Sequence, residues 1–186
     1  MTFANGDNQT RHNILATIVE HDANRPRSKQ TEVGCSSLGT ACQRQLAYRI
    51  LGVAGRHKHR FSWLAMIGTS VHAYLETIFS EHPDRYLAEQ VVKVSSGEVS
   101  IPGTVDLYDK HTRTVIDFKV VGDTTLNKAR RGIISAQYIT QVNLYGLGLQ
   151  QAGHQVENVA ILFLPKTKEL SDAAYVEKPF DETLAT

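Results

Sequence analysis

The sequence predicts an α/β domain in which a mixed central β-sheet is flanked by helices. Two observations favour this class. Segments rich in β-branched residues alternate with amphipathic helical segments along the chain, and such alternation is typical of α/β folds. The length of 186 residues suits one domain with a full core. We expect a hairpin at residues 103–119 to lie centrally, with helices 61–80 and 134–152 packed against it.

The two ends of the chain differ from its middle. Residues 1–35 are predicted to form an N-terminal helix and a linker, because apolar residues at helical spacing precede a polar stretch that contains Pro26. The main domain is expected over residues 36–186. Its last residues, 181–186, look like the opening of a helix, so we expect a truncation or a domain boundary there.

Two helices are predicted between the linker and the first strand. Residues 36–52 begin with serines that can cap a helix and end at a glycine. Residues 61–80 carry a broad apolar face. On another face of that helix, Gly68, His72 and Glu76 recur at every fourth residue. His72 and Glu76 could therefore reach towards a common point.

The hairpin at 103–119 carries charges where a core strand should be apolar. Asp106 lies in its first strand, and Asp117 and Lys119 lie in its second. Charged residues are rare in core strands unless something compensates them. Asp117 and Lys119 are two residues apart and so project from the same face, and the hairpin brings Asp106 towards them. Further strands are predicted over residues 86–94, 156–165 and 175–180.

Two carboxylates that converge beside an ammonium group favour a metal site. The carboxylates repel each other unless a cation lies between them, and a hard divalent ion such as Mg²⁺ fits oxygen ligands. Lys119 is then a candidate for holding an attacking water or stabilising a developing negative charge. The alternative is an ordinary hairpin whose charges form a salt bridge at its rim. Glu89, near the start of strand 86–94, is either a further acidic contributor to the site or a strand-edge charge, and the sequence favours the second.

The predicted helix at 134–152 follows a basic cluster that includes Arg130 and Arg131. On this helix Gln137, Gln141 and Tyr145 are spaced by four residues and share one face. Glutamine can hydrogen-bond a nucleotide, and tyrosine can contact a phosphate or stack on a base.

These motifs, in this order, resemble the RecB-like branch of the PD-(D/E)XK nuclease superfamily. The signature of an acidic residue, a hairpin and acidic-x-Lys is matched by Asp106, the turn and Asp117-Phe118-Lys119. The pair Gln141 and Tyr145 resembles the QxxxY motif of that branch. The resemblance extends to the earlier helices through Cys42-x-Arg44 and the row Gly68, His72 and Glu76.

The resemblance implies a restriction-endonuclease-like core and a metal-dependent DNA nuclease. The implied role is that of an exonuclease in recombination, repair or phage DNA processing, with one or two Mg²⁺ or Mn²⁺ ions. Its catalytic residues would be Asp106, Asp117 and Lys119. The metal ligands would be His72, Asp106, Asp117 and the Phe118 backbone carbonyl, with Glu76 as an additional candidate. Residues expected to contact DNA are Arg44, Arg130, Arg131, Gln137, Gln141 and Tyr145.

Charge, cysteine content and hydropathy limit the binding partners, cofactors and cellular location that we expect. The formal net charge is +1, so DNA binding would need a local basic patch such as residues 55–60. No cysteine follows Cys42, so we expect no four-cysteine iron–sulfur cluster within this chain. No apolar run is long enough to span a membrane and no signal-peptide core is present. We expect a cytoplasmic protein, in a bacterial host cell if phage-encoded, whose partners are DNA and a single-strand-annealing or recombination protein.

Two other functions remain open at the level of sequence. One is a catalytically inactive module that keeps the nuclease fold and binds DNA without metal. The other is a metal-dependent hydrolase of a smaller phosphoester, which the basic segments and the Gln141–Tyr145 helix disfavour. The sequence does not distinguish exonuclease from endonuclease action, nor the polarity of digestion.

Overall fold

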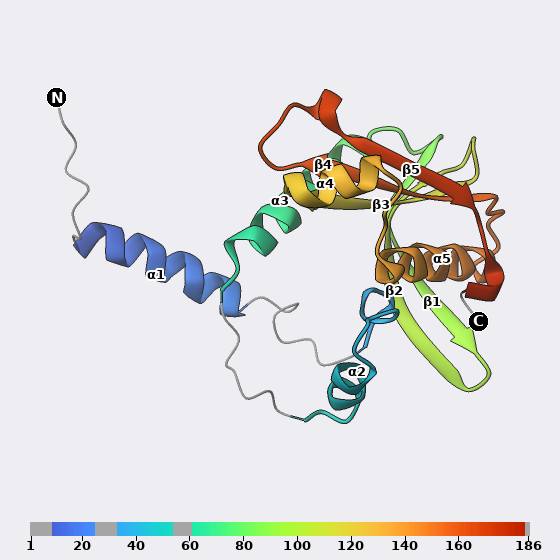
Figure 1. The fold of residues 1–186 in the computed structure, drawn as a ribbon, viewed down its shortest axis with the longest axis horizontal. Coiled ribbons are helices and arrows are strands. Elements are labelled where there is room, and N and C mark those ends of the chain that lie inside the picture. The colour runs from blue at the N-terminus through green and yellow to red at the C-terminus, as the bar shows by residue number, and fades with distance from the viewer. Residues whose placement is uncertain (1–8, 25–32, 54–60, 185–186) are drawn as a thin grey trace.

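A five-stranded sheet forms the centre of the molecule. The computed structural model describes residues 9–24, 33–53 and 61–184. The strands lie in the order β1-β2-β3-β4-β5 (Figure 1). Only β3 and β4 are parallel to each other, and the other neighbours are antiparallel. The predicted mixed sheet is therefore confirmed. The strands are β1 (Tyr86–Ser96), β2 (Val99–Asp109), β3 (Thr114–Val121), β4 (Asn158–Pro165) and β5 (Ala174–Pro179).

Helices cover both faces of this sheet. Helix α5 (Ala136–Gln151) packs on one face, in a core cluster that contains Phe163 of β4. Helix α3 (Trp63–Ser80) packs on the opposite face, in a cluster that contains Leu164, the next residue of β4. Successive residues of a strand point to opposite faces, which places the two helices on opposite sides. The central hairpin therefore lies between α3 and α5, as predicted.

The sequence defines the start of both long helices. The side chain of Ser62 accepts a hydrogen bond from the backbone N–H of Ala65 at the start of α3. Ser135 accepts one from the N–H of Tyr138 at the start of α5. Such caps satisfy backbone donors that have no partner inside the helix. The two helices that carry candidate site residues thus begin close to where the sequence predicted them.

The segment predicted as a helix over 36–52 is different in its first part. It begins with a 3-10 turn, η2 (Cys35–Ser37), and the α-helix α2 spans only Gln43–Ile50. Between them Gly39 has a φ of +70°, a left-handed conformation that ends the turn. Cys35, the last residue of the predicted linker, is buried in the main core.

A short helix was missed after β3. Where no helix was predicted from the sequence, the chain forms α4 (Asp123–Arg130), which buries Leu126 and Ala129 against the core cluster under α5. With only two buried residues in eight, its apolar periodicity is too short to stand out from a polar loop. The opening of a helix expected at 181–186 is a single 3-10 turn, η4 (Glu182–Leu184).

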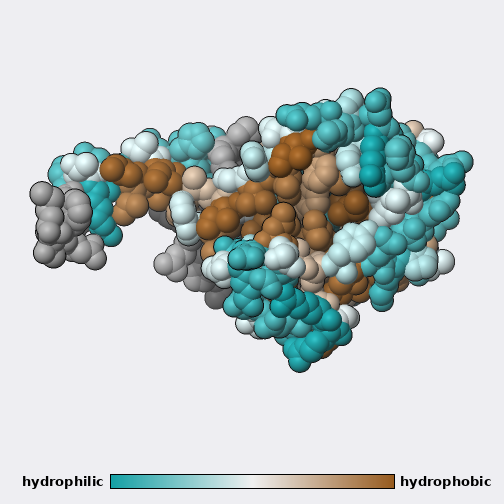
Figure 2. Space-filling view, turned by 90° about the horizontal axis from the view of Figure 1, so that it is seen from above, coloured by the Kyte–Doolittle hydropathy of each residue, from teal (hydrophilic) through white to brown (hydrophobic). Residues whose placement is uncertain are grey.

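The N-terminal helices expose apolar side chains. Helix α1 (Gln9–Asn24) exposes Ile14, Leu15 and Val19, and α3 exposes Trp63 and Tyr74. Figure 2 shows apolar side chains along α1 and across the middle of the face seen there. No helix among the described residues combines the length and apolarity needed to cross a bilayer.

Candidate active site

The site opens where β2 and β3 separate. The two strands are paired only from Asp109↔Thr114 to Leu107↔Ile116. Beyond this point the backbone N–H of Phe118 donates to Oδ2 of Asp106 at 2.7 Å instead of to a strand carbonyl. In an extended strand the N–H and C=O of one residue face the same edge. The Phe118 carbonyl therefore faces the same opening as the Asp106 carboxylate.

Asp117 is fully buried beside this opening, with 0% exposure. Its Oδ1 accepts a hydrogen bond from Nε2 of Gln141 at 3.0 Å. Its Oδ2 lies 2.6 Å from Nζ of Lys119, but not in hydrogen-bonding geometry, and no described donor satisfies that oxygen. Burial raises the pKa of the Asp117 carboxyl, and the Lys119 ammonium opposes this shift. A buried carboxylate with one unsatisfied oxygen is the kind of group that a cation stabilises.

Lys119 is held in place by several neighbours. Besides the ion pair with Asp117, its Nζ donates to Oε1 of Gln141 at 3.2 Å. The same atom lies 5.0 Å from the centre of the Tyr138 ring, within the range of a cation–π contact. Its ammonium group is therefore fixed next to the carboxylates.

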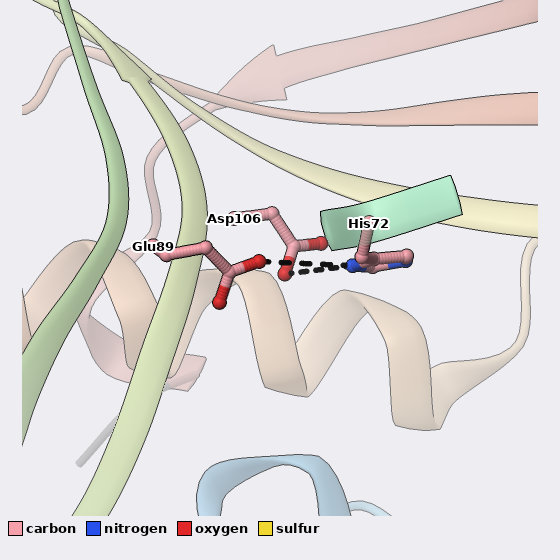
Figure 3. Close-up of side chains that lie close together, drawn as sticks. All are labelled: His72, Glu89 and Asp106. Carbon is pink, nitrogen blue, oxygen red and sulfur yellow. Dashed lines mark ion pairs between the residues drawn. The ribbon is translucent and has the colours of Figure 1, made fainter. Parts of the chain in front are cut away.

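His72 approaches the opening from the α3 side of the sheet. Its Nδ1 lies 3.4 Å from Oδ1 of Asp106 and 4.0 Å from Oε1 of Glu89 (Figure 3). Hydrogen bonding to Asp106 raises the pKa of the imidazole, whereas burial lowers it. One potential ligand atom from each of His72, Glu89 and Asp106 lies within 4.8 Å of the other two. These three side chains form a group that could hold a metal ion.

Glu89 enters this group because the backbone changes face at its position. In β1, Leu87 belongs to the core cluster under α5, and so do Val92 and Val94. Val92 and Val94 follow Leu87 by five and seven positions, both odd offsets, so the regular alternation of a strand is interrupted between them. Glu89 lies in this interval with a φ of +47°, which is uncommon for a residue other than glycine. Its position in the group with His72 and Asp106 favours the other alternative, that Glu89 is a further acidic contributor to the site.

These side chains line a cleft with a volume of about 700 Å³. Its floor depends on Gly103, because a Cβ there would lie 2.8 Å from Sγ of Cys35 and 3.0 Å from Cε1 of Tyr145. A smaller apolar cavity between α5, β4 and β5 contains none of the charged site residues. The cleft is lined by Gly34, Cys35, Ser36, His72, Glu89, Val91, Pro102, Gly103, Thr104, Asp106, Asp117, Lys119, Gln141 and Tyr145.

Known structures resemble this architecture, although no protein-family model and no curated protein matches the chain. An alkaline exonuclease from Laribacter hongkongensis superposes with a TM-score of 0.58 at 12% identity, covering 85% of this chain and 82% of that chain. A phage-related exonuclease from Haemophilus somnus 129PT gives a TM-score of 0.56 at 14% identity, with coverages of 82% and 86%. The protein SSO0001 gives a TM-score of 0.56 at 16% identity, with coverages of 96% and 83%.

The chain has the same fold as these two exonuclease structures. Within this fold the structure brings together Asp106, Asp117, Lys119 and His72, as the sequence predicted. Glu76, the additional candidate ligand, is not part of the group. It lies one turn beyond His72 on α3 and is exposed to solvent.

The residues expected to contact DNA divide into two sets. Gln141 and Tyr145 line the cleft, but both are buried, at 6% and 5% exposure, and are hydrogen-bonded to each other. The others lie outside the cleft lining. The basic segment at residues 55–60 falls outside the described residues.

The residues outside the cleft are Arg44, Arg130, Arg131 and Gln137, and three of them make hydrogen bonds within the protein. Arg130 donates to the carboxylate and the backbone carbonyl of Asp172, and Arg131 donates to a carbonyl of its own helix. Gln137 donates to the backbone carbonyl of Ser36 at 2.8 Å and so ties α5 to the η2 turn. Arg44 is exposed on α2. None of these four side chains lines the cleft.

Proposed function

We propose that the protein is a metal-dependent DNA nuclease that hydrolyses phosphodiester bonds in the cleft between β1, β2, β3 and α5. The observation that carries this proposal is the convergence of Asp106, Asp117 and Lys119 where β2 and β3 separate. Two acidic side chains and a fixed ammonium group suit a reaction in which negative charge develops on phosphate oxygens. The exonuclease names of structures with the same fold support it.

The donor set fits Mg²⁺ or Mn²⁺. Carboxylate oxygens are available from Asp106, Asp117 and Glu89, and an imidazole from His72. The charge balance supports the fit, because the carboxylates of Asp106 and Asp117 line the same cleft as the single ammonium among its described lining residues, that of Lys119, which lies 2.6 Å from Oδ2 of Asp117. When bound, such an ion lowers the pKa of a water molecule and withdraws charge from phosphate oxygens. We propose Asp106, Asp117, His72, Glu89 and the Phe118 carbonyl as its ligands.

The protein's own residues have separable roles. Asp106 is oriented by the backbone N–H of Phe118, so its carboxylate keeps one direction towards the cleft. Lys119 places a positive charge beside the site, where it can stabilise the transition state or orient the attacking water. Because the Lys119 ammonium is paired with the Asp117 carboxylate, we favour an electrostatic role over that of a general base.

The first experiment is hydrolysis of labelled DNA by the purified protein. We expect degradation with Mg²⁺ or Mn²⁺ and none with EDTA, because the acidic cluster needs the cation. DNA binding that is independent of metal and has no turnover would instead show an inactive module. Comparison of linear with closed circular DNA distinguishes exonuclease from endonuclease action, and labels at the 5′ and 3′ ends give the polarity.

The finer role proposed is that of a cytoplasmic exonuclease in recombination, repair or phage DNA processing. Two structural neighbours, an alkaline exonuclease and a phage-related exonuclease, support it. A single-strand-annealing or recombination protein is proposed as a partner on the same basis. Co-purification with such a protein from the native host would test that partnership.

Glu89 offers a specific test of the ligand set. Glu89→Gln keeps the shape of the side chain but removes its charge, so we expect activity and Mn²⁺ affinity to fall by about 10- to 100-fold. Glu98→Gln, in the exposed turn after β1, is the matched control and should change neither. Calorimetric titration with Mn²⁺ and initial rates on DNA would measure both. Unchanged Mn²⁺ affinity in Glu89→Gln would exclude Glu89 as a ligand.

A further inference from the structure

Gln141 is a neutral side chain at the centre of the charged site. It lies on α5 with 6% exposure, above the face of β3 that carries Asp117 and Lys119. Its Nε2 donates to Oδ1 of Asp117 at 3.0 Å and to the hydroxyl oxygen of Tyr145 at 2.7 Å. Its Oε1 accepts from Nζ of Lys119 at 3.2 Å. One amide group therefore contacts both charged members of the acidic-x-Lys pair.

Chemistry determines which way this amide points. A carboxylate only accepts hydrogen bonds and an ammonium group only donates them. The NH₂ end of Gln141 must therefore face Asp117, and the carbonyl end must face Lys119. The reverse orientation would place oxygen against oxygen and nitrogen against nitrogen.

The amide has no hydrogen left for a nucleotide. An NH₂ group has two hydrogens, and here they go to Asp117 and to Tyr145. Tyr145 lies one helical turn after Gln141, and the missing side chain of Gly103 leaves room for its ring. The neighbours of Gln141 thus hold it in a single orientation.

Hydrogen bonds to Gln141 add direction to the ion pair of Lys119 and Asp117. Lys119 and Asp117 approach to 2.6 Å without hydrogen-bonding geometry. Their directional hydrogen bonds to described side chains are those with Gln141. The Gln141 amide holds Oδ1 of Asp117, while Oδ2 faces the Lys119 ammonium at 2.6 Å.

We propose that Gln141 is a positioning residue, which orients Asp117 for a divalent ion and Lys119 for the phosphate, and that it does not contact DNA. This inference rests on the proposed nuclease function. It replaces the expectation from sequence that Gln141 hydrogen-bonds a nucleotide. Partners that orient metal ligands typically change metal affinity or activity by about 10- to 100-fold when they are lost.

The test compares Gln141→Met with Gln150→Met, a control in the last turn of the same helix. Methionine keeps the length of the side chain and removes the amide. Mn²⁺ affinity is measured by calorimetry without DNA, and kcat and KM are measured with DNA. For Gln141→Met we expect Mn²⁺ affinity to fall by about 10-fold and kcat by about 10- to 100-fold, with KM changed by less than about 2-fold.

The outcomes separate this inference from the proposed function. A raised KM with unchanged kcat and Mn²⁺ affinity would show a DNA contact and overturn the inference. A wild-type protein that binds Mn²⁺ but cuts no DNA would refute the nuclease, while weaker Mn²⁺ binding by Gln141→Met would still support positioning. Wild-type protein that binds no Mn²⁺ would refute both.

A second variant covers the case in which Gln141→Met does not fold. Tyr145→Phe removes only the hydroxyl that accepts from Gln141 and keeps the ring against Gly103. We expect a change in the same direction but smaller, about 2- to 5-fold in Mn²⁺ affinity and kcat. If Tyr145→Phe instead raises KM alone, the hydroxyl contacts DNA, and its role in positioning Gln141 is refuted.

Discussion

Replacing Asp117 with asparagine is expected to lower the rate of DNA hydrolysis by at least about 1,000-fold. Asp117 is buried, and one of its oxygens has no hydrogen-bond donor among the described residues. Asparagine keeps the shape and still accepts a hydrogen bond from Gln141, but it is a much weaker ligand for a divalent ion. The variant should therefore lose metal binding together with activity, measured by Mn²⁺ calorimetry and initial rates.

When both proteins are free of metal, Asp117→Asn should be more stable than the wild type. Burial raises the pKa of the Asp117 carboxyl, so the ionised form is less favourable in the folded than in the unfolded chain. The wild type consequently loses stability as the pH rises from below the unfolded pKa through the folded one. The asparagine side chain of the variant does not titrate, so the gain in Tm of Asp117→Asn over the wild type in EDTA should grow from about pH 5 to about pH 8.

Asp84→Asn supplies the control for this experiment, because Asp84 is exposed in the turn before β1. It should retain wild-type activity and Mn²⁺ affinity. Full activity in Asp117→Asn would refute the assignment of the site. A Tm gain that stays constant with pH would refute only the account of the buried carboxylate.

Residue spacing was enough to predict the centre of this site. Asp117 and Lys119 share a face because side chains of a strand alternate, and the hairpin turn brings Asp106 to them. Helical spacing likewise placed Gln141 and Tyr145 on one face. It could not show whether that face points to DNA or into the protein. The structure turns it towards β3, where both side chains are buried.

Residue spacing could not predict the position of the Glu89 side chain. Regular alternation from Leu87 to Val94 would give a strand without interruption, but the backbone at Glu89 has a φ of +47°. Left-handed backbone is expected of glycine or asparagine, not glutamate, and costs about 1–2 kcal/mol. Such strain persists only where the surrounding structure enforces it, and it is often found at functional sites. The sequence contains no local signal for it.

The first turn of the domain was missed for a related reason. The η2 turn at Cys35 is fixed by contacts distant in sequence, including the bond from Gln137 to the carbonyl of Ser36. Local propensity alone favoured one continuous helix from 36 to 52. Tertiary contacts outweighed it, as they often do when propensities are weak.

Replacing Lys119 with methionine is expected to separate catalysis from metal binding. Methionine keeps the apolar length of the side chain and removes the ammonium that lies 2.6 Å from Oδ2 of Asp117. We expect kcat to fall by about 100- to 1,000-fold, because a fixed positive charge next to the reacting phosphate is lost. Lys178→Met, an exposed change on β5, should leave kcat unaltered.

Although kcat should fall in Lys119→Met, its affinity for Mn²⁺ should not. Without the ammonium, Asp117 is a buried carboxylate with no cation beside it, which lowers the stability of the metal-free protein by about 3 kcal/mol. A bound ion would then offset that desolvation without competing with Lys119, so Lys119→Met should bind Mn²⁺ at least as tightly as the wild type. Its Tm should also rise more on Mn²⁺ addition. If Lys119→Met does not bind Mn²⁺, then Lys119 supports the structure of the metal site. If Lys119→Met keeps the wild-type kcat, then Lys119 has no role in the chemical step.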